Sequence, residues 1–260
     1  MPIIKGLEWT FDTVASEYAR LRPGYPAELY EKIFAYIPIC QGSKALEIGI
    51  GGGQATLPVL ETGCQVTAVE YGDHFSRLCR EKFKDYPGFS VITGKFEDAV
   101  LSQNTYDLVF SASAFHWVPE EIGYKKVLSI LKKGGAFARL ANHPFRDKGN
   151  PILCDRIQEL YAKYMNYTTP PEEYRPIDAK EIAEIPVKYG FTDIKYELFK
   201  RTRTFSSQEY ITLLGTYSDH IVLEEHIRAE FFSKIQEAID SCGGKITIYD
   251  TLDLQLARKP

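Results

Sequence analysis

Two acidic residues and three regularly spaced glycines are the residues of this chain best suited to binding a ligand. Glu47 precedes the turn "GIGGGQ", in which Gly49, Gly51 and Gly53 fall at every second position, and Glu70 ends the next apolar run. Glycine lets a backbone approach a ligand closely, and an ionised carboxylate accepts hydrogen bonds from hydroxyl or ammonium groups. A dinucleotide, a nucleotide phosphate and a methyl-donor nucleoside can all bind against such a turn.

The spacing of the glycines indicates which of these ligands the turn is suited to bind. A dinucleotide fingerprint, G-x-G-x-x-G, needs its third glycine where this chain has Gln54. The glycines present follow the pattern E-x-G-x-G-x-G, which begins at Glu47. Glu70 does not discriminate by itself, because an acidic residue at the end of the second strand also binds the ribose in dinucleotide folds. A nicotinamide-dependent oxidoreductase therefore stays open as an alternative.

The stretch "LEIGIGGG" resembles the E/D-x-G-x-G-x-G motif of class I S-adenosylmethionine-dependent methyltransferases. This resemblance implies S-adenosylmethionine as the cofactor, with Glu47 near its ammonium group, directly or through water, and Glu70 on both ribose hydroxyls. The segments "FDTVASEYARLRPGYP" and "SASAFHWVP" resemble the trans-aconitate-methyltransferase-like and ubiquinone/menaquinone-methyltransferase-like group. A protein that binds S-adenosylmethionine without catalysis would carry the same motifs.

The resemblance assigns further side chains to the cofactor. Tyr18 and Arg22 would help to cover it; a ring in the core and an arginine on the surface are the alternative interpretation. Phe96 and Glu97, in "GKFEDA", would contact the adenine, next to Lys95 where the family often has an acidic residue. The other expected cofactor contacts are Gln54, Tyr71, Ser111 and Ala112.

His116 is the candidate catalytic residue. It follows the fourth predicted strand, whose carboxyl end should open on the ligand crevice. An imidazole suits proton transfer near neutral pH, which a hydroxyl acceptor needs and a carboxylate acceptor does not. Trp117 beside it would form an apolar wall. A hydrogen-bonded structural histidine that shapes the cofactor pocket is the alternative interpretation.

Short aliphatic runs that alternate with helical patterns predict the elements that position these residues. The expected strands are "ALEIG", "QVTAVEY", "FSVITG", "YDLVFSAS", "AFARLAN", "DIKYELFKRTRTF" and "KITIYDTLDLQLARK". Alternation of this kind predicts an α/β fold, with a Rossmann-like, mostly parallel seven-stranded sheet and helices on both faces. "LKKGG" at 131–135 is expected to end a helix, and Pro58 to delay or bend the helix after the glycine turn.

The whole chain, residues 1–260, is expected to form a single methyltransferase domain. Its predicted parts are N-terminal cap helices (1–40), the cofactor-binding core (41–142), an inserted lid with a proline-rich loop (143–190) and the last strands and helices of the core (191–260). The lid prediction rests on that loop and on the benefit of excluding water from a reacting site.

Composition narrows the possible partners. A net charge of -4 lacks the basic balance of nucleic-acid binders, and five dispersed cysteines without a C-x-x-C pair predict no metal site. No apolar run approaches the ~20 residues that span a bilayer, and "MPIIKGLEWT" lacks the apolar stretch of a signal peptide. The expected protein is cytoplasmic, binds neither nucleic acid nor membrane, and methylates a small molecule on a carboxylate or hydroxyl. The oligomeric state stays open.

Overall fold

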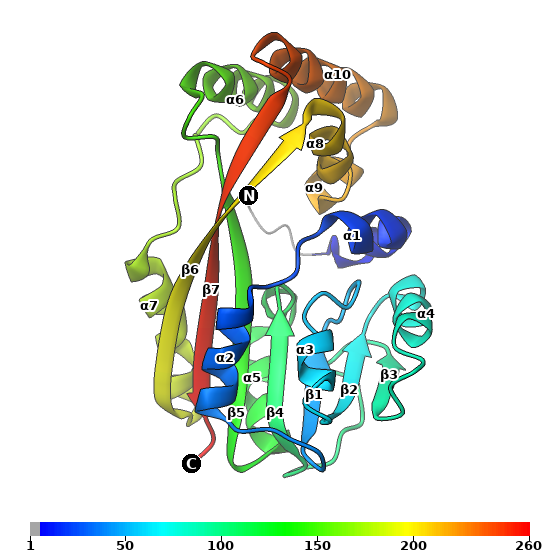
Figure 1. The fold of residues 1–260 in the computed structure, drawn as a ribbon, viewed down its shortest axis with the longest axis vertical. Helices are drawn as coiled ribbons and strands as arrows, with labels where there is room; N and C mark the ends of the chain where they lie inside the picture. The colour runs from blue at the N-terminus through cyan, green and yellow to red at the C-terminus, as the bar shows by residue number, and fades with distance from the viewer. Residues whose placement is uncertain (1–5) are drawn as a thin grey trace. The chain divides into compact units, whose positions relative to one another are not determined.

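The computed structural model describes residues 6–260 and contains a seven-stranded sheet with strand order β3-β2-β1-β4-β5-β7-β6 (Figure 1). The strands are β1 (Lys44–Ile48), β2 (Gln65–Glu70), β3 (Phe89–Thr93), β4 (Tyr106–Ala112), β5 (Leu131–Phe145), β6 (Thr192–Ser206) and β7 (Lys245–Arg258). The α-helices are α1 (Ala15–Leu21), α2 (Ala27–Tyr36), α3 (Leu57–Leu60), α4 (Asp73–Lys82), α5 (Glu120–Ile130), α6 (Pro151–Met165), α7 (Pro176–Glu184), α8 (Ser207–Leu214), α9 (Ser218–Ile221) and α10 (Glu225–Ser241). The 3₁₀ helices are η1 (Glu8–Val14), η2 (Phe115–Trp117) and η3 (Ile185–Tyr189).

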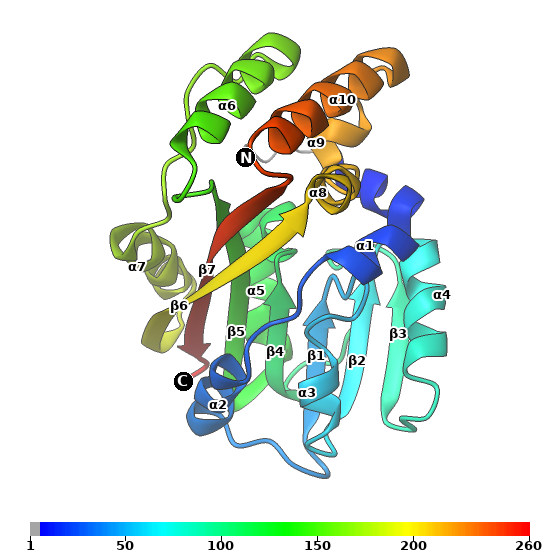
Figure 2. The same ribbon diagram turned by 45° about the horizontal axis from the view of Figure 1, so that its top comes forward.

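The sheet is mostly parallel, which confirms the predicted fold class. Strand β1 pairs in parallel with β2 and β4, and the parallel pairing continues from β2 to β3 and from β4 to β5. The arrow of β7 runs opposite to that of β4 in both ribbon views (Figures 1 and 2). Because β1, β2 and β4 run in one direction, their carboxyl ends meet at one edge, where α/β sheets bind ligands.

Side chains of the sheet pack into two separate hydrophobic cores, one on each face, as expected for a sheet covered on both faces. Leu108 and Phe110 of β4 pack with Leu29 of α2 in one core, whereas Val109, between them, packs with Tyr124 of α5 in the other. Successive side chains of a strand point to opposite faces, so this alternation requires helices on both sides. Figure 2 shows α2 and α3 in front of the sheet and α5 behind it.

The chain divides into two compact units. The sheet unit consists of Arg22–Asn142, Arg175–Phe199 and Leu252–Pro260, and the helical unit of His143–Tyr174, Lys200–Thr251 and the residues up to Leu21. The helical unit has a core of its own, in which Leu153 of α6 packs with Phe231 and Ile235 of α10. The segment predicted as one lid, 143–190, contributes to both units. Its action as a lid stays a prediction.

The helix predicted to end within "LKKGG" ends earlier. Helix α5 stops at Ile130, and its C-cap residue Leu131 has the extended backbone angles φ -65° and ψ 142°. Residues from Leu131 onward already belong to β5, and Nζ of Lys132 donates to both carboxylate oxygens of Asp107, each at 2.8 Å. The helix therefore ends before this segment and not within it, because strand pairing and this ion pair place the segment in the sheet; the left-handed φ of 77° at Gly134 lies within β5.

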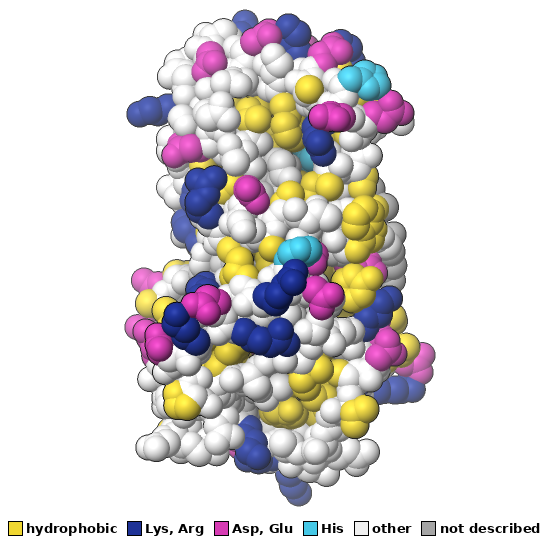
Figure 3. All heavy atoms as spheres, turned by 90° about the vertical axis from the view of Figure 1, so that its right-hand side faces the viewer, with side chains coloured by type: hydrophobic (Ala, Val, Ile, Leu, Met, Phe, Trp, Pro, Cys, Tyr) yellow, Lys and Arg dark blue, Asp and Glu magenta, His cyan; other side chains and the backbone are white. Residues whose placement is uncertain are grey.

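Charged side chains of both signs are interspersed on the face that Figure 3 shows. Such mixing produces short-range pairs rather than an extended field of one sign. Within residues 6–260, no helix is both long and apolar enough to cross a bilayer. The same part of the chain contains no group of three or more His, Cys, Asp or Glu side chains placed to hold a metal ion.

Candidate functional site

The glycine turn at the carboxyl end of β1 has a left-handed backbone at every second residue. The φ angles of Gly49, Gly51 and Gly53 are 71°, 52° and 69°. A residue with a side chain is destabilised by about 1–2 kcal/mol in the left-handed region. The backbone conformation of the turn therefore explains why glycine occupies these three positions. After the turn, α3 begins only at Leu57, with Pro58 in its first turn, which confirms the predicted late start.

The turn is also packed too closely for side chains at two of these positions. A Cβ atom on Gly49 would overlap the Cβ of Ala114, which follows β4. A Cβ atom on Gly53 would lie 2.7 Å from Cε2 of Phe83, at the end of α4. The turn is therefore packed between the β4 loop and α4.

We expect Gly49→Ala to destabilise the sheet unit and to weaken binding at this turn. Overpacking costs about 1–3 kcal/mol, and the left-handed backbone adds about 1–2 kcal/mol. Ala114→Gly removes the overlapping atom, so the double variant should recover the packing part and keep the backbone part. Thermal unfolding of both single variants and of the double variant measures this; a double variant no more stable than Gly49→Ala would contradict the packing argument.

Glu70 ties the turn to the end of β2. One carboxylate oxygen, Oε2, accepts the backbone N–H of Gly51 at 2.9 Å, and Oε1 accepts that of Gly72 at 2.8 Å. The residue is only 7% exposed. A carboxylate oxygen can accept more than one hydrogen bond. Glu70 can therefore hold the turn and receive two ligand hydroxyls with the same two oxygens.

Glu47 is a buried carboxyl group beneath the turn. It is 1% exposed, and its Oε2 accepts the hydroxyl of Thr56 at 2.7 Å. Burial raises the pKa of Glu47 to about 8, although the hydrogen bond from Thr56 opposes that rise. Its other oxygen, Oε1, is buried without a hydrogen-bond partner in the described part of the chain. An ammonium group or a bound water would give this oxygen a donor.

The end of β4 contributes a fixed backbone and two half-buried aromatic residues. Ser111 is fully buried, and its hydroxyl donates to the carbonyl of Ile48 at 2.8 Å, so it joins the ends of β4 and β1. Phe115 is buried against Tyr124 and anchors η2. Because Phe115 points into the core, its neighbours His116 and Trp117 stay half-buried at the sheet edge.

The segment after β3 is organised by one lysine of α5. Nζ of Lys126 donates to the backbone carbonyls of Phe96 at 2.6 Å, Glu97 at 3.0 Å and Ala99 at 2.6 Å. Phe96 is 4% exposed, whereas Tyr71 is exposed and has Nζ of Lys95 at 5.5 Å from its ring centroid. The carbonyls of the predicted adenine segment therefore already have a donor, and the ring of Phe96 lies in the core, which leaves the side chain of Glu97 and the backbone N–H groups for a ligand.

Two residues that hold the turn were not predicted from the sequence. Lys82, at the end of α4, donates to the carbonyls of Gly52 at 2.8 Å and Gly53 at 3.1 Å. Cys79, one helical turn earlier, donates its thiol to the carbonyl of Gly51 at 3.1 Å. Burial raises the pKa of Cys79 to about 12, so it remains a donor. No local pattern marks either residue, because each bonds a segment distant in sequence.

The sheet unit contains all but one of the predicted site residues. Those around the sheet edge are Glu47, Gly49, Gly51, Gly53, Gln54, Glu70, Tyr71, Phe96, Glu97, Ser111, Ala112 and His116. Arg22 belongs to the same unit and follows α1. Tyr18 lies on α1 in the helical unit, where its ring meets Phe11 edge-on at 5.7 Å. The contact of each residue with a cofactor stays a prediction.

Comparisons with known sequences identify relatives of this chain. Residues 46–138 match a family model described as a methyltransferase domain. An uncharacterized methyltransferase of Geobacillus sp. strain WCH70 is 30% identical over 147 residues, which cover 53% of this chain and 68% of that protein. Uncharacterized methyltransferase C25B8.09 of Schizosaccharomyces pombe is 25% identical over 231 residues, covering 88% of this chain and 87% of the relative.

Solved structures share the fold of this chain. A putative type II methyltransferase from Anaeromyxobacter dehalogenans matches with a TM-score of 0.65 and 20% identity, over 92% of this chain and 98% of the other. Haemonchus contortus phosphoethanolamine N-methyltransferase 2, in complex with phosphomonomethylethanolamine and S-adenosylhomocysteine, matches with a TM-score of 0.55 and 16% identity, over 100% and 61% of the two chains. With the sequence relatives and the acidic, glycine-rich turn, these findings show that the chain belongs to the S-adenosylmethionine-dependent methyltransferases.

Proposed function

We propose that the protein methylates a small molecule on a carboxylate or hydroxyl oxygen. The observation that carries the cofactor half of this proposal is the pair of buried carboxyl groups, Glu47 and Glu70, on either side of the glycine turn. They suit the ammonium and the ribose hydroxyls of S-adenosylmethionine, which has no pyrophosphate to bind. The small molecule bound to the Haemonchus contortus N-methyltransferase supports a small-molecule acceptor, and the choice of an oxygen as the methylated atom is our own proposal.

The proposed roles of the residues follow from their surroundings. Glu70 would receive the ribose hydroxyls, Glu47 the ammonium group, and the glycine turn from Gly49 to Gly53 the methionine portion. Tyr71, Glu97 and the backbone of Phe96 would surround the adenine. When bound, S-adenosylmethionine would supply a methyl carbon activated by its sulfonium, and S-adenosylhomocysteine would be the leaving group. The other proposed cofactor contacts are Tyr18, Arg22, Gln54, Ser111 and Ala112.

The alternatives differ in measurable ways. A nicotinamide-dependent oxidoreductase is not supported, because the chain has Gln54 at the third glycine position and its relatives are methyltransferases. A protein that binds the cofactor without turnover would form no S-adenosylhomocysteine. Incubating the protein with methyl-deuterated S-adenosylmethionine and panels of carboxylic acids, phenols and alcohols, followed by mass spectrometry, tests the proposal. Deuterated esters or ethers support it; cofactor binding without any product contradicts it.

His116→Ala should lower turnover more than it lowers cofactor affinity. The enzyme must hold the acceptor at near-attack distance, and a hydroxyl acceptor also needs a base, whose removal typically costs about 10²–10⁴-fold. His116 is the half-buried histidine at the carboxyl end of β4. Turnover on the acceptor found above and affinity for S-adenosylhomocysteine are measured side by side. His226→Ala, at an exposed histidine of α10, is the matched control.

The outcomes for His116 separate its two roles. A loss confined to turnover supports proton transfer or acceptor positioning. An equal loss of cofactor affinity supports a structural histidine that shapes the cofactor pocket. Turnover equal to that of the wild type would remove the catalytic role.

A further inference from the structure

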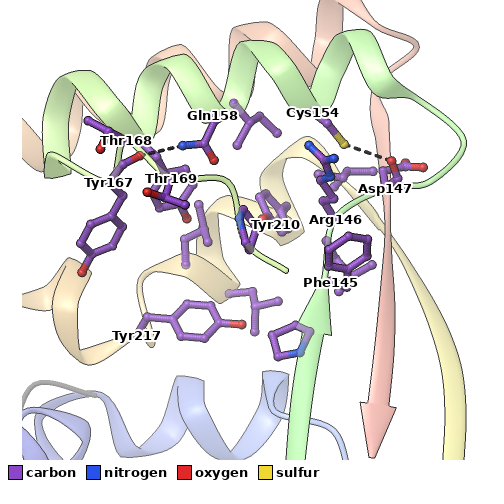
Figure 4. A pocket seen from close by; sticks show the side chains of 18 of the residues that line it. Phe145, Arg146, Asp147, Cys154, Gln158, Tyr167, Thr168, Thr169, Tyr210 and Tyr217 are labelled. Carbon is purple, nitrogen blue, oxygen red and sulfur yellow. Dashed lines mark hydrogen bonds between the residues drawn. The ribbon is translucent and has the colours of Figure 1, made fainter. Parts of the chain in front are cut away.

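The helical unit contains a cavity that none of the predicted site residues line. Its volume is about 460 Å³, and its walls come from the end of β5, α6, the loop after α6, α8 and the start of β7 (Figure 4). Cavities of roughly 300–1,000 Å³ typically hold one small organic molecule. All of its lining residues belong to the helical unit, so the cavity is complete within that unit.

Most of the lining is apolar. The aliphatic part comes from Ile157 of α6, Leu213 and Leu214 of α8, and Ile246 and Ile248 of β7. Both leucines are buried, with 1% and 2% of their surfaces exposed. Rings of Phe145, Tyr161, Tyr210 and Tyr217 add to these walls. A ligand that fills this cavity gains by removing its own apolar surface from water.

Two of the lining tyrosines are held by a buried pair of polar residues. The hydroxyl of Tyr161 lies 2.9 Å from Nε2 of His220, and Nδ1 of His220 lies 2.7 Å from Oδ1 of Asp219. Tyr167 donates to the other oxygen of Asp219 at 3.1 Å. Burial holds the pKa of Tyr161 well above its usual value, so its hydroxyl keeps its proton. These bonds fix two aromatic rings of the wall before any ligand arrives.

The charged residues of the lining are Arg146 and Asp147. Asp147 has hydrogen-bond partners for its charge, whereas Arg146 has no ion-pair partner in the described part of the chain. Both oxygens of Asp147 accept backbone N–H groups, from Gly149 and from Thr247, each at 2.8 Å. Arg146 is exposed, and its contact is with the ring of Phe145, 5.8 Å from the centroid. It forms no ion pair with any residue from 6 to 260. The rim of an apolar cavity therefore presents an unmatched positive charge.

We propose that this cavity binds a largely apolar small molecule that carries a carboxylate. Binding in this cavity does not require methyl transfer. The apolar walls would take the hydrocarbon or aromatic body of the ligand. Arg146 would pair with its carboxylate, for which a guanidinium is geometrically suited.

Titration calorimetry with phenylbutyrate, its methyl ester and phenylbutanol tests the proposal directly. We expect all three probes to bind, and the acid to bind about two- to fivefold more tightly than the ester, because exposed ion pairs are weak. Arg146→Gln should remove this preference and leave the ester and the alcohol unchanged. Arg156→Gln, which removes the same charge from an exposed residue of α6 outside the lining, is the matched control.

Filling the cavity should abolish binding of all three probes. Leu213→Trp places an indole ring inside the cavity. Thr169→Trp places the same ring there from the exposed loop after α6, where a substitution disturbs folding less. Because the indole occupies the space that a probe would fill, neither variant should show saturable binding of any probe. Ile152→Trp, at a residue of α6 that is 64% exposed, adds the same ring outside the cavity.

Cofactor affinity separates this proposal from the proposed function. The cavity-filling variants should bind S-adenosylhomocysteine as the wild type does. Probe binding that persists in both cavity-filling variants, or the absence of saturable binding of every probe to the wild type, would overturn the cavity proposal. Failure of the wild type to bind S-adenosylhomocysteine would instead overturn the proposed function, whatever the probes do.

Discussion

Glu70→Ala should weaken the binding of S-adenosylhomocysteine by at least about 100-fold. Hydrogen bonds to a charged group contribute about 1.5–3 kcal/mol each, and two ribose hydroxyls are expected to donate to this carboxylate. Two such bonds amount to about 3–6 kcal/mol, or roughly 10²–10⁴ in affinity. Titration calorimetry measures the loss. Glu61→Ala, which removes an exposed carboxylate from the same unit, should have no effect.

The same substitution also removes two bonds that hold the turn. Without the Glu70 carboxylate, the N–H groups of Gly51 and Gly72 lose their partners. Part of the lost affinity would then reflect a loosened turn rather than a lost contact. An analogue of S-adenosylhomocysteine that lacks one ribose hydroxyl separates the two causes. The wild type should bind this analogue more weakly than the parent ligand, and Glu70→Ala should bind both equally.

A second comparison completes this test. If Glu70→Ala still prefers the parent ligand by the same factor as the wild type, the ribose does not contact Glu70. In that case the residue acts only through the turn, and Glu70→Gln, which keeps the side-chain size and one acceptor oxygen, should recover much of the thermal stability of the ligand-free protein.

The cofactor edge of the sheet was predictable because its signals are local. Gly49, Gly51 and Gly53 all need a left-handed backbone, and that need shows in the sequence as glycine at alternate positions. Glu47 is the last residue but one of β1 and Glu70 is the last of β2, and parallel pairing of these strands brings their carboxyl ends together. Residue type and order along the chain therefore contained most of the geometry.

Other features depend on contacts that the order of residues does not reveal. Lys82 and Thr56 bond the turn and Glu47 from helical or irregular segments, and neither stands in a recognisable motif. "LKKGG" has the composition of a helix end, yet the carboxylate of Asp107 on β4 binds Lys132 in the sheet. Tertiary partners decided the local conformation there.

The cavity of the helical unit shows the same limit on a larger scale. Its walls combine residues near 145, 157, 213 and 247, which lie on four elements with no shared sequence pattern. The sequence predicts residues 143–190 as a single inserted segment, but the structure divides them between the two units at Tyr174. Proline-rich composition indicated a loop correctly and said nothing about which residues would enclose a cavity.

Cofactor binding should release a proton near neutral pH, and the proton should come from Glu47. Burial raises the pKa of this carboxyl group from 4.5 to about 8, so the group is mostly protonated in the ligand-free protein below about pH 8. An ammonium group placed against its buried Oε1 favours the carboxylate and lowers that pKa. By linkage, the affinity should rise with pH up to about 8, by at most about tenfold per pH unit.

The stability of the ligand-free protein should change in the opposite direction. The folded-state pKa of Glu47 lies above its unfolded value, so the folded state binds the extra proton. The resulting stability is fully present below about 4.5 and is lost as the pH rises through about 8. Glu47→Gln keeps an acceptor for the hydroxyl of Thr56 and cannot titrate, so it should flatten both pH profiles.

Calorimetric titrations near neutral pH, in buffers with different heats of ionisation, count the released protons. The heat of S-adenosylhomocysteine binding to the wild type should depend on the buffer, whereas that of Glu47→Gln should not, and the variant also corrects for any proton that the ligand itself loses. Equal buffer dependence in the two proteins would show that Glu47 keeps its proton when the cofactor binds. The ammonium group would then have to find its acceptor elsewhere, and the buried Oε1 would need a water molecule as its donor.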